Sequence, residues 1–224
     1  MHPLDRLIWT ALTTRQAHFA EGGEQARRMR AAIGPFAATA DASPEAAAAL
    51  AAQIPDGGDI SLLEPNPPAL PAGASLAMSR AGVQMLAREL TADGRSFPIE
   101  PLGDADAAEM RALAELTKPG PFRAETHRLG RFVGIRDGGR LVAMAGERLQ
   151  IDGFIEVSAV CTHPDYRGRG YGAALMRTVG ARICAEGAQP FLHSYADNTG
   201  AIALYRKLGF THRADVTHAV WVRA

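Results

Sequence analysis

Apolar and polar positions in the second half of the chain change period repeatedly. Apolar runs of strand length predict a short strand at 97–102 and three longer strands within 131–162. Between them, helical spacing with acidic residues in the first turn predicts a helix at 104–116. Aspartate and glycine interrupt the strand pattern at 137–139 and 152–153, and these residues favour hairpin turns. Residues 131–162 are therefore predicted to form an antiparallel meander.

Two helices and two strands complete this half of the chain. Residues 170–186 place four apolar side chains on one helical face, and Gly187 follows as a C-terminal stop. Strands are predicted at 191–195 and 215–223, with a capped helix at 197–209 between them. The order is then β-α-β-β-β-α-β-α-β, which predicts an α+β (mixed α/β) fold with a mixed, mostly antiparallel sheet flanked by helices.

The first 94 residues carry weaker patterns. Apolar positions near helical spacing predict helical structure at 3–20. A second, short helix is predicted at 43–54, because Ser43 is a good N-cap residue and Pro44 suits the first helical position. No internal repeat and no catalytic constellation stands out in this region.

A proline-rich stretch at 64–73 indicates a linker or an irregular edge, since proline cannot donate to a sheet ladder. The runs at 75–79 and 83–90 are predicted to be two strands. We therefore expect an N-terminal helical or mixed region at 1–94 and a main domain at 95–224. The N-terminal region is expected to extend the sheet or to cover one side of the functional site.

Composition narrows the classes of protein. Acidic and basic residues balance at 24 each, so no net field attracts nucleic acid or an anionic membrane. No apolar run approaches the roughly 20 residues of a spanning helix, and charged residues at positions 5 and 6 argue against a signal peptide. Cys161 and Cys184 are expected to be packed thiols in a reducing compartment. The chain is therefore predicted to be cytoplasmic, without a metal site.

The stretch VCTHPDYRGRGYGAALM, at 160–176, carries the strongest chemical signal. A predicted strand enters a helix through a turn in which glycine occupies every second position, at Gly168, Gly170 and Gly172. The first N–H groups of a helix have no internal partner, and together with the helix dipole they bind phosphate groups. Glycine lets the backbone approach such a ligand closely. Because two arginines add positive charge, we predict a phosphate or pyrophosphate site.

Other phosphate-binding patterns fit less well. The turn also satisfies a loose dinucleotide fingerprint, with Asp197 as a ribose partner. That fingerprint normally opens a series of βαβ units, whereas here a hairpin meander precedes the turn and only 52 residues follow it. The Gly-Lys-Ser/Thr of a Walker loop is absent from the sequence. A nicotinamide-dependent oxidoreductase therefore remains a weaker alternative.

This stretch resembles the acyl-CoA-binding motif of the GNAT superfamily of N-acetyltransferases. Arg167, Gly170 and Gly172 match the family pattern of Gln/Arg-x-x-Gly-x-Gly/Ala. The stretch DNTGAIALYRKLGF, at 197–210, resembles the second motif of the family, and 99–116 is similar to its usual opening strand and helix. The resemblance runs from about residue 97 to 224, and it implies a GNAT-like fold.

The resemblance also implies how acetyl-CoA binds. The main chain of the strand that precedes the loop is expected to bind pantetheine, and the loop amides to bind the pyrophosphate. Asn198 matches a family asparagine that contacts the co-substrate, although it is equally expected as a helix cap. The implied cofactor-binding residues are Val160, Cys161, Thr162, Arg167, Gly168, Arg169, Gly170, Tyr171, Gly172, Asn198 and Tyr205.

The implied chemistry is acyl transfer from a thioester to an amine. Tyr205 matches the family tyrosine that donates a proton or a hydrogen bond to the departing thiolate. Glu156 shares a strand face with Ser158 and Val160, and it is predicted to face a wet cleft and act as the base. His193 is a second candidate for the base, although a structural role is the stronger expectation for it.

We therefore predict an N-acetyltransferase that acts on an amine of a small molecule or peptide. A non-catalytic acyl-CoA-binding sensor is the alternative from another class, but a sensor does not need Tyr205. No nucleic acid, membrane or metal is expected as a partner. The sequence does not identify the acceptor, and it does not distinguish a monomer from a homodimer.

Overall fold

The computed structural model describes residues 2–92 and 94–224, and its main feature is a large mixed sheet. Neighbouring strands in this sheet pair antiparallel, except for one parallel pair, β9 and β10. In spatial order the strands are β4 (Asp59–Glu64), β11 (Thr211–Arg223), β5 (Ala74–Leu86), β10 (Gln189–Tyr195), β9 (Phe154–Thr162), β8 (Arg140–Ile151), β7 (Phe132–Asp137) and β6 (Glu100–Leu102). The predicted α+β fold with a mostly antiparallel sheet is confirmed.

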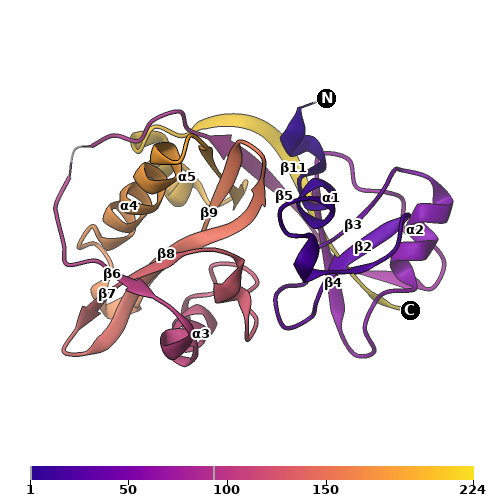
Figure 1. Cartoon of the computed structure of the whole chain (residues 1–224), viewed down its shortest axis with the longest axis horizontal. Helices are drawn as coiled ribbons and strands as arrows, with labels where there is room; N and C mark the ends of the chain where they lie inside the picture. Colours follow the sequence, from indigo (N-terminus) through magenta and orange to yellow (C-terminus); the bar gives the residue numbers. More distant parts are fainter. Residues whose placement is uncertain (1, 93) are drawn as a thin grey trace.

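Helices cover both faces of this sheet (Figure 1). Helix α3 (Ala107–Thr117) packs on one face through Met110 and Leu113. On the opposite face lie α4 (Tyr171–Ala185) and α5 (Thr199–Lys207), over a core that includes Val157 and Leu192. The order of elements from β6 to β11 is the β-α-β-β-β-α-β-α-β order that the sequence predicts.

The N-terminal part forms a smaller lobe that the sequence patterns describe only in part. Helix α2 (Pro44–Ala51) begins where predicted, and the Ser43 side chain accepts a hydrogen bond from the Ala46 N–H. Helical structure near the start is shorter than expected: α1 spans Leu7–Thr13, with short 3-10 turns on either side. A small antiparallel sheet, which the sequence analysis missed, contains β1 (Ala20–Gly22), β2 (Ala26–Met29) and β3 (Ala37–Thr39).

The prediction of two strands at 75–79 and 83–90 is wrong, because one continuous strand, β5, covers the whole first run and the first half of the second. Gly82 lies within β5, where a Cβ atom would come within 3.1 Å of the Ser194 carbonyl oxygen and 3.2 Å of the Val216 side chain. The glycine therefore permits close strand packing and does not end the strand.

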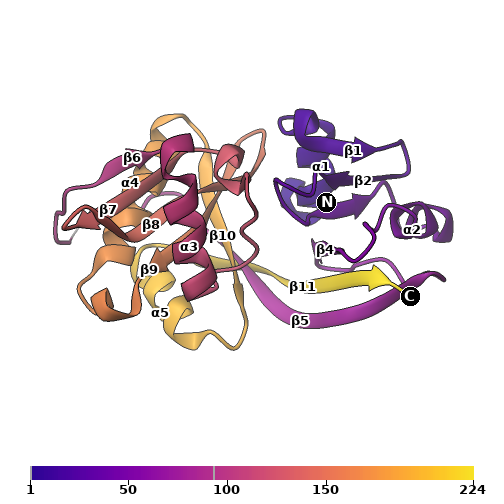
Figure 2. The same ribbon diagram turned by 90° about the horizontal axis from the view of Figure 1, so that it is seen from below.

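Strands β5 and β11 form a long ribbon that runs from the main lobe into the N-terminal lobe (Figure 2). The two lobes also share one apolar core, in which Leu7 and Ile8 of α1 pack with Leu149 of β8 and Phe191 of β10. Strand β5 thus lies inside the main sheet although it precedes residue 95. The division of the chain near residue 94 stays a prediction.

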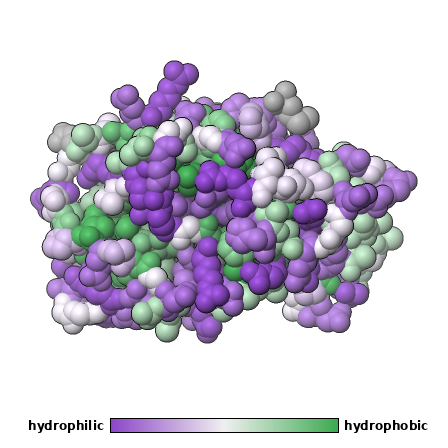
Figure 3. Space-filling model, in the orientation of Figure 1, coloured by the Kyte–Doolittle hydropathy of each residue, from purple (hydrophilic) through white to green (hydrophobic). Residues whose placement is uncertain are grey.

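Polar side chains cover most of the face shown in Figure 3, and apolar residues are exposed between them in smaller patches. Among residues 2–92 and 94–224, no helix is both long and apolar enough to cross a membrane. Cys161 is buried and Cys184 partly buried, and both are free thiols, as expected.

Candidate active site

The glycine turn joins β9 to α4 and leaves its backbone exposed. Gly168 and Gly170 have φ angles of 77° and 92°, in the left-handed region that glycine adopts without strain. Gly170 is the N-cap residue of α4, and the first hydrogen bond into the helix runs from the Ala174 N–H to the Gly170 carbonyl. The N–H groups of the first turn therefore point out of the helix end, where an anion can accept from them.

The side chains of the turn frame this helix end. Arg167 and Arg169 are exposed, and the Arg169 guanidinium lies 4.5 Å from the centre of the Tyr166 ring. Tyr171 packs edge-on against Phe97, with ring centres 4.8 Å apart. A Cβ atom added at Gly168 would meet nothing within 4 Å. The turn thus offers free amides, open space and positive charge together, which is the combination that a pyrophosphate requires.

Strand β9 bends just before the turn. Gly146 of β8 pairs with Ser158, but Met144 pairs with Cys161, so β9 holds one extra residue at this point. Ala159 lies in this bulge with a φ angle of 51°, an uncommon value for a residue with a side chain. Beyond the bulge β9 no longer runs beside β10, since their parallel pairing covers only Phe154–Glu156 and Gln189–Phe191. The two strands therefore separate.

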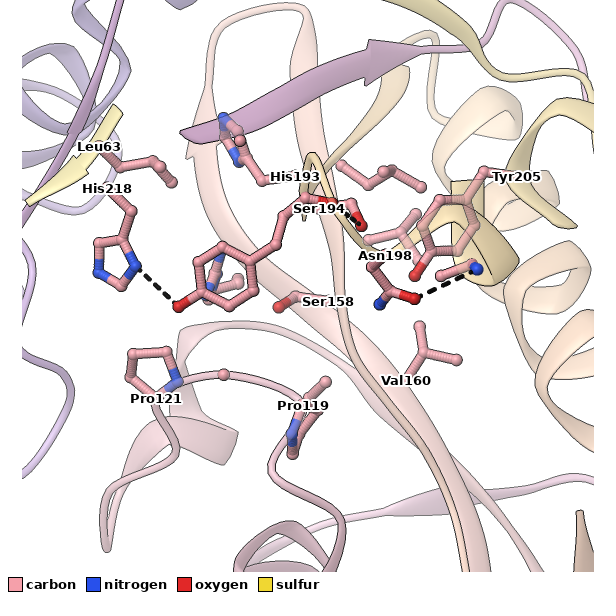
Figure 4. Close-up of a pocket in the computed structure, with 18 of the residues that line it drawn as sticks. Leu63, Pro119, Pro121, Ser158, Val160, His193, Ser194, Asn198, Tyr205 and His218 are labelled. Atoms are coloured by element: carbon pink, nitrogen blue, oxygen red, sulfur yellow. Dashed lines mark hydrogen bonds between the residues drawn. The ribbon is translucent and has the colours of Figure 1, made fainter. Parts of the chain in front are cut away.

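A cavity of about 310 Å³ lies where β9 and β10 separate (Figure 4). Residues from both strands, from α5, from β11 and from the loop after α3 line it. They include Thr117, Lys118, Pro119, Pro121, Arg148, Ser158, Val160, His193, Ser194, Tyr195, Asn198, Tyr205 and His218. Leu63 and Gly82 of the N-terminal region also line the cavity.

The predicted pantetheine-binding residues lie at the end of β9 beside this cavity. Val160 lines the cavity and Thr162 is half-buried, but the Cys161 side chain is buried in the core under α3. Burial raises the pKa of the Cys161 thiol to about 12, so the group stays protonated. Only the main chain of Cys161 is available to a ligand in the cavity.

Asn198 and Tyr205 both come from the α5 segment, and both side chains reach the cavity. Asn198 caps the helix, because its side-chain oxygen accepts from the Ala201 N–H at 3.3 Å. Its amide nitrogen is left for another partner. Burial raises the pKa of the Tyr205 phenol above its ordinary value, which keeps the hydroxyl protonated and able to donate.

The expectation that Glu156 faces a wet cleft is wrong. Its side chain is fully buried, does not line the cavity, and accepts from the Arg148 guanidinium at 2.8 Å and 2.6 Å. Burial alone would disfavour the carboxylate, but the charge and hydrogen bonds of Arg148, with a hydrogen bond from His193, lower its pKa to about 2. Glu156 is therefore a permanent, paired anion. Strand period alone could not reveal this, because the partner comes from β8.

His193 lines the cavity, but both of its ring nitrogens have partners. Nδ1 lies 2.7 Å from a Glu156 oxygen, and Nε2 lies 2.9 Å from the side-chain nitrogen of Gln84. The Gln84 oxygen accepts from Arg213 at 2.7 Å, so the Gln84 nitrogen donates to His193. Nδ1 of His193 therefore donates to Glu156 while Nε2 accepts from Gln84, and the structural role expected for His193 fits this geometry.

Sequence analysis missed a second pair of side chains in the cavity. The Tyr195 hydroxyl and His218 Nδ1 share a hydrogen bond of 3.0 Å (Figure 4). Arg80 lies over the Tyr195 ring, 3.6 Å from its centre, and pairs with Asp197 at 2.8 Å. Burial, followed by the charge of Arg148, lowers the pKa of His218 to about 4, so it is neutral at pH 7. Strand β11 carries no motif that marks His218, and only the sheet order brings it to Tyr195.

The structure also bears on a metal site and on the dinucleotide-binding alternative. Within the part of the chain that the structure describes, no group of three acidic, histidine or cysteine side chains could hold a metal. The dinucleotide alternative is not supported, because among residues 2–92 and 94–224 β9 and β10 are the one parallel strand pair of the main sheet. A series of parallel strands is what that alternative needs.

Comparison with known sequences gives a consistent result. Residues 132–222 match the family described as FR47-like protein. The chain is also 38% identical over 132 residues to the N-alpha-acetyltransferase RimI of Mycobacterium tuberculosis, an alignment that covers 54% of this chain and 82% of that protein.

Solved structures show the same likeness over greater length. A crystal structure of a GNAT-family acetyltransferase from Novosphingobium aromaticivorans matches with a TM-score of 0.91 and 43% identity, covering all of both chains. A GCN5-related N-acetyltransferase from Kribbella flavida matches with a TM-score of 0.66 and 19% identity over 98% of this chain and 96% of that one, which supports the fold alone.

Proposed function

Because the chain belongs to the GNAT superfamily of N-acetyltransferases, we propose that it transfers the acetyl group of acetyl-CoA directly to an amine of a small molecule or peptide. Acetyl transfer is the activity of the family. We propose in addition which residues take part, that the amine attacks the thioester directly, and which class of acceptor is used. The observation that carries it is the separation of β9 from β10 next to the glycine turn. This separation supports a slot for the pantetheine arm that leads from the turn into the cavity.

The loop and strand residues fit acetyl-CoA as a co-substrate. Main-chain amides from Gly168 to Gly172 bind the pyrophosphate, and the arginines of the turn add charge. The expected Arg167 amide is not included, because it donates to the Pro164 carbonyl at 3.2 Å. The main chain of Val160, Cys161 and Thr162 hydrogen-bonds the pantetheine amides as an added strand would. The amide nitrogen of Asn198 contacts the same arm.

Tyr205 acts on the leaving group. Acetyl-CoA, when bound, supplies an activated acetyl thioester whose thiol departs. The protonated hydroxyl of Tyr205 lies in the cavity, where it can donate to that sulfur as negative charge develops. A main-chain N–H near Cys161 polarises the carbonyl of the thioester.

The proton of the attacking amine goes to the Tyr195–His218 pair. Glu156 is not proposed for this step, because it is fully buried and does not line the cavity, so an amine in the cavity does not reach it. His193 has partners on both nitrogens, whereas Tyr195 and His218 line the cavity with a neutral imidazole. Glu156 instead positions Arg148 and His193.

An assay of free-thiol release from acetyl-CoA with a panel of amines tests the function. We expect release that depends on both the enzyme and an amine, and mass spectrometry should find the acetylated amine. The likeness to an N-alpha-acetyltransferase makes α-amines the first acceptors to try. Tight acetyl-CoA binding without release for any amine would instead indicate a sensor.

A further inference from the structure

We propose that Arg148 is a carboxylate-binding residue of the acceptor site, so that the acceptor is an amine that also carries a carboxylate, as an α-amino acid does. This inference rests on the proposed function, because it names the acceptor class for the same cavity. Arg148 lies on β8 and lines the cavity together with Ser158 of β9.

The Arg148 guanidinium is held rigidly but is only partly used. Its Nε and Nη2 atoms donate to Glu156, and its guanidinium carbon lies 4.7 Å from the centre of the Phe36 ring. The residue is 8% exposed. Nη1 makes no hydrogen bond with any residue that the structure describes, and it lies 3.8 Å from where a Cβ atom of Gly120 would be. Gly120 and Arg148 both line the cavity. The two N–H groups of Nη1 are therefore available to a ligand in the cavity.

Buried arginines usually satisfy their donors. A fixed guanidinium with one free nitrogen in a cavity is a preorganised site for an oxygen acceptor, because little side-chain entropy remains to be lost on binding. The hydroxyl of Ser158 points into the same space and has no hydrogen-bond partner among residues 2–92 and 94–224 (Figure 4). Arg148 and Ser158 therefore offer donors to the two oxygens of one carboxylate.

The charge of the lining favours an anionic group over a cationic one. Within the described residues, no aspartate or glutamate lines the cavity, while Lys118 and Arg148 do. Glu156, the partner of Arg148, is fully buried and does not line the cavity, and burial lowers the pKa of His218, which keeps that imidazole neutral at pH 7. A polyamine or another polycation would find no acidic partner here, whereas a carboxylate would meet free donors and Lys118.

The size of the cavity agrees with a small acceptor. Its volume of about 310 Å³ is at the lower end of the usual range for ligand sites, roughly 300–1,000 Å³. The end of the pantetheine arm must share this space. An amino acid is small enough to place its amine near Tyr205 and Tyr195 with its carboxylate at Arg148, since all three residues line one cavity.

Matched pairs of amines test the inference on the unmodified enzyme. Each pair is an amino acid and its decarboxylated amine: leucine with 3-methylbutylamine, phenylalanine with phenethylamine, glycine with methylamine. Because side chain and amine are constant within a pair, we expect kcat/KM to be about 10- to 100-fold higher for the better amino acids, the range of a charge-assisted hydrogen bond. Equal or better use of the decarboxylated amine in every pair would overturn the proposal.

The amino acid amides separate a carboxylate from a neutral carbonyl. We expect kcat/KM for leucinamide to be at least about fivefold lower than for leucine, because leucinamide lacks the negative charge that Lys118 and Arg148 would attract. Leucinamide equal to leucine would overturn the carboxylate assignment and indicate a peptide-like acceptor instead.

Two variants assign the preference to Arg148. Arg148→Lys keeps a cation for Glu156 but removes the free nitrogen, and Arg148→Met combined with Glu156→Gln removes both charges of the buried pair. We expect both variants to lose the preference within each pair, so that kcat/KM falls more for the amino acid than for its decarboxylated amine. Arg111→Lys, at an exposed Arg–Glu pair on α3, is the matched control and should keep the preference. A preference that survives both Arg148 variants would contradict the inference.

Binding provides a readout independent of turnover. Leucine titrated calorimetrically into the enzyme with CoA should bind at least about tenfold more weakly to Arg148→Lys than to the parent. The outcomes also separate the two proposals. No thiol release with any amine would contradict the proposed function, whereas release without a carboxylate preference would contradict only the acceptor class.

Discussion

At the scale of single residues, the cavity wall is fixed by a buried chain of polar contacts. Arg148 pairs with Glu156, which accepts from His193, and His193 in turn accepts from Gln84. Arg213 fixes Gln84 from the other side. Each side chain forms a hydrogen bond with the next one, so the cavity wall keeps one geometry in a region where an unpaired charge would be costly. Glu156 contributes to the site through this order, without contact with the acceptor.

Loss of the Tyr205 hydroxyl should slow the chemical step. We expect Tyr205→Phe to lower kcat about 100-fold, the lower range for a general acid, with little change in acetyl-CoA affinity. Steady-state kinetics and calorimetry measure the two effects separately. Tyr166→Phe removes a phenol hydroxyl that bonds Asp137 at the surface, and it should leave kcat unchanged. An unchanged kcat in Tyr205→Phe would mean that another group protonates the thiolate.

His218 should make the protein less stable in acid. Its pKa is about 4 when folded, chiefly because of burial, against an ordinary value of 6.5. Between these values the unfolded state binds a proton that the folded state does not bind. The contribution of neutral His218 is therefore fully present above about pH 6.5, and it declines as pH falls toward 4. Urea unfolding at several pH values should show this decline, and His218→Gln should show less of it.

At the scale of elements, helix α4 depends on glycine at both ends for different reasons. Gly170 and Gly187 both have left-handed φ angles, 92° and 76°. Gly187 only lets the chain leave the helix, since a Cβ there would meet nothing within 4 Å. Gly170 also belongs to the turn proposed to bind pyrophosphate. The two positions therefore share a backbone cost but differ in function.

This difference gives a controlled test of the turn. Gly170→Val and Gly187→Val should each lose about 1–2 kcal/mol of stability from left-handed strain, a fall in Tm of about 2–8 °C. Only Gly170→Val should also weaken acetyl-CoA binding, by tenfold or more, because its side chain obstructs the approach to the amides. Equal affinity of both variants for acetyl-CoA in calorimetry would contradict the assignment of the turn.

At the scale of the whole molecule, strand β5 joins what the sequence separates. It pairs with β10 on one side and with β11 on the other, so the main sheet is continuous only when the N-terminal region supplies this strand. The same region contributes Leu63 and Gly82 to the cavity wall. Strands β4 and β5 thus supply part of the cavity wall from within the main sheet.

The fragment 95–224 should therefore not fold as a stable domain. Without β5, strands β10 and β11 lose the neighbour that lies between them, and Leu149, Phe191 and Val216 lose the apolar contacts of α1. We expect no cooperative thermal transition for the fragment, whereas the full chain should show one. A cooperative transition in the fragment would support the domain division near residue 94.

Local sequence patterns were sufficient to predict the secondary structure of the second half of the chain and the position of the glycine turn. Some features depend only on neighbours within a few residues, so the local residue types predict them. These are the hairpins after β7 and β8, the cap at Ser43 and the helix between Gly170 and Gly187. The prediction of two strands in place of β5 was wrong. Gly82 lies within the strand because β10 and β11 pack closely against it, and these contacts come from residues far away in the sequence. The small N-terminal sheet has strands too short to carry a clear period.

The sequence by itself determined the order of elements from β6 to β11, the glycine turn and the family, because each depends on residues close together in the chain. Only the tertiary structure decided which polar groups face the cavity. It buried Glu156 against Arg148, brought Tyr195 to His218, and left Nη1 of Arg148 without a hydrogen-bond partner among the residues that the structure describes. These outcomes depend on contacts between strands that are distant in sequence, and the pKa of a side chain is set by such contacts and by burial. The protonation state of each group, and with it the chemistry of the site, is therefore a property of the folded chain.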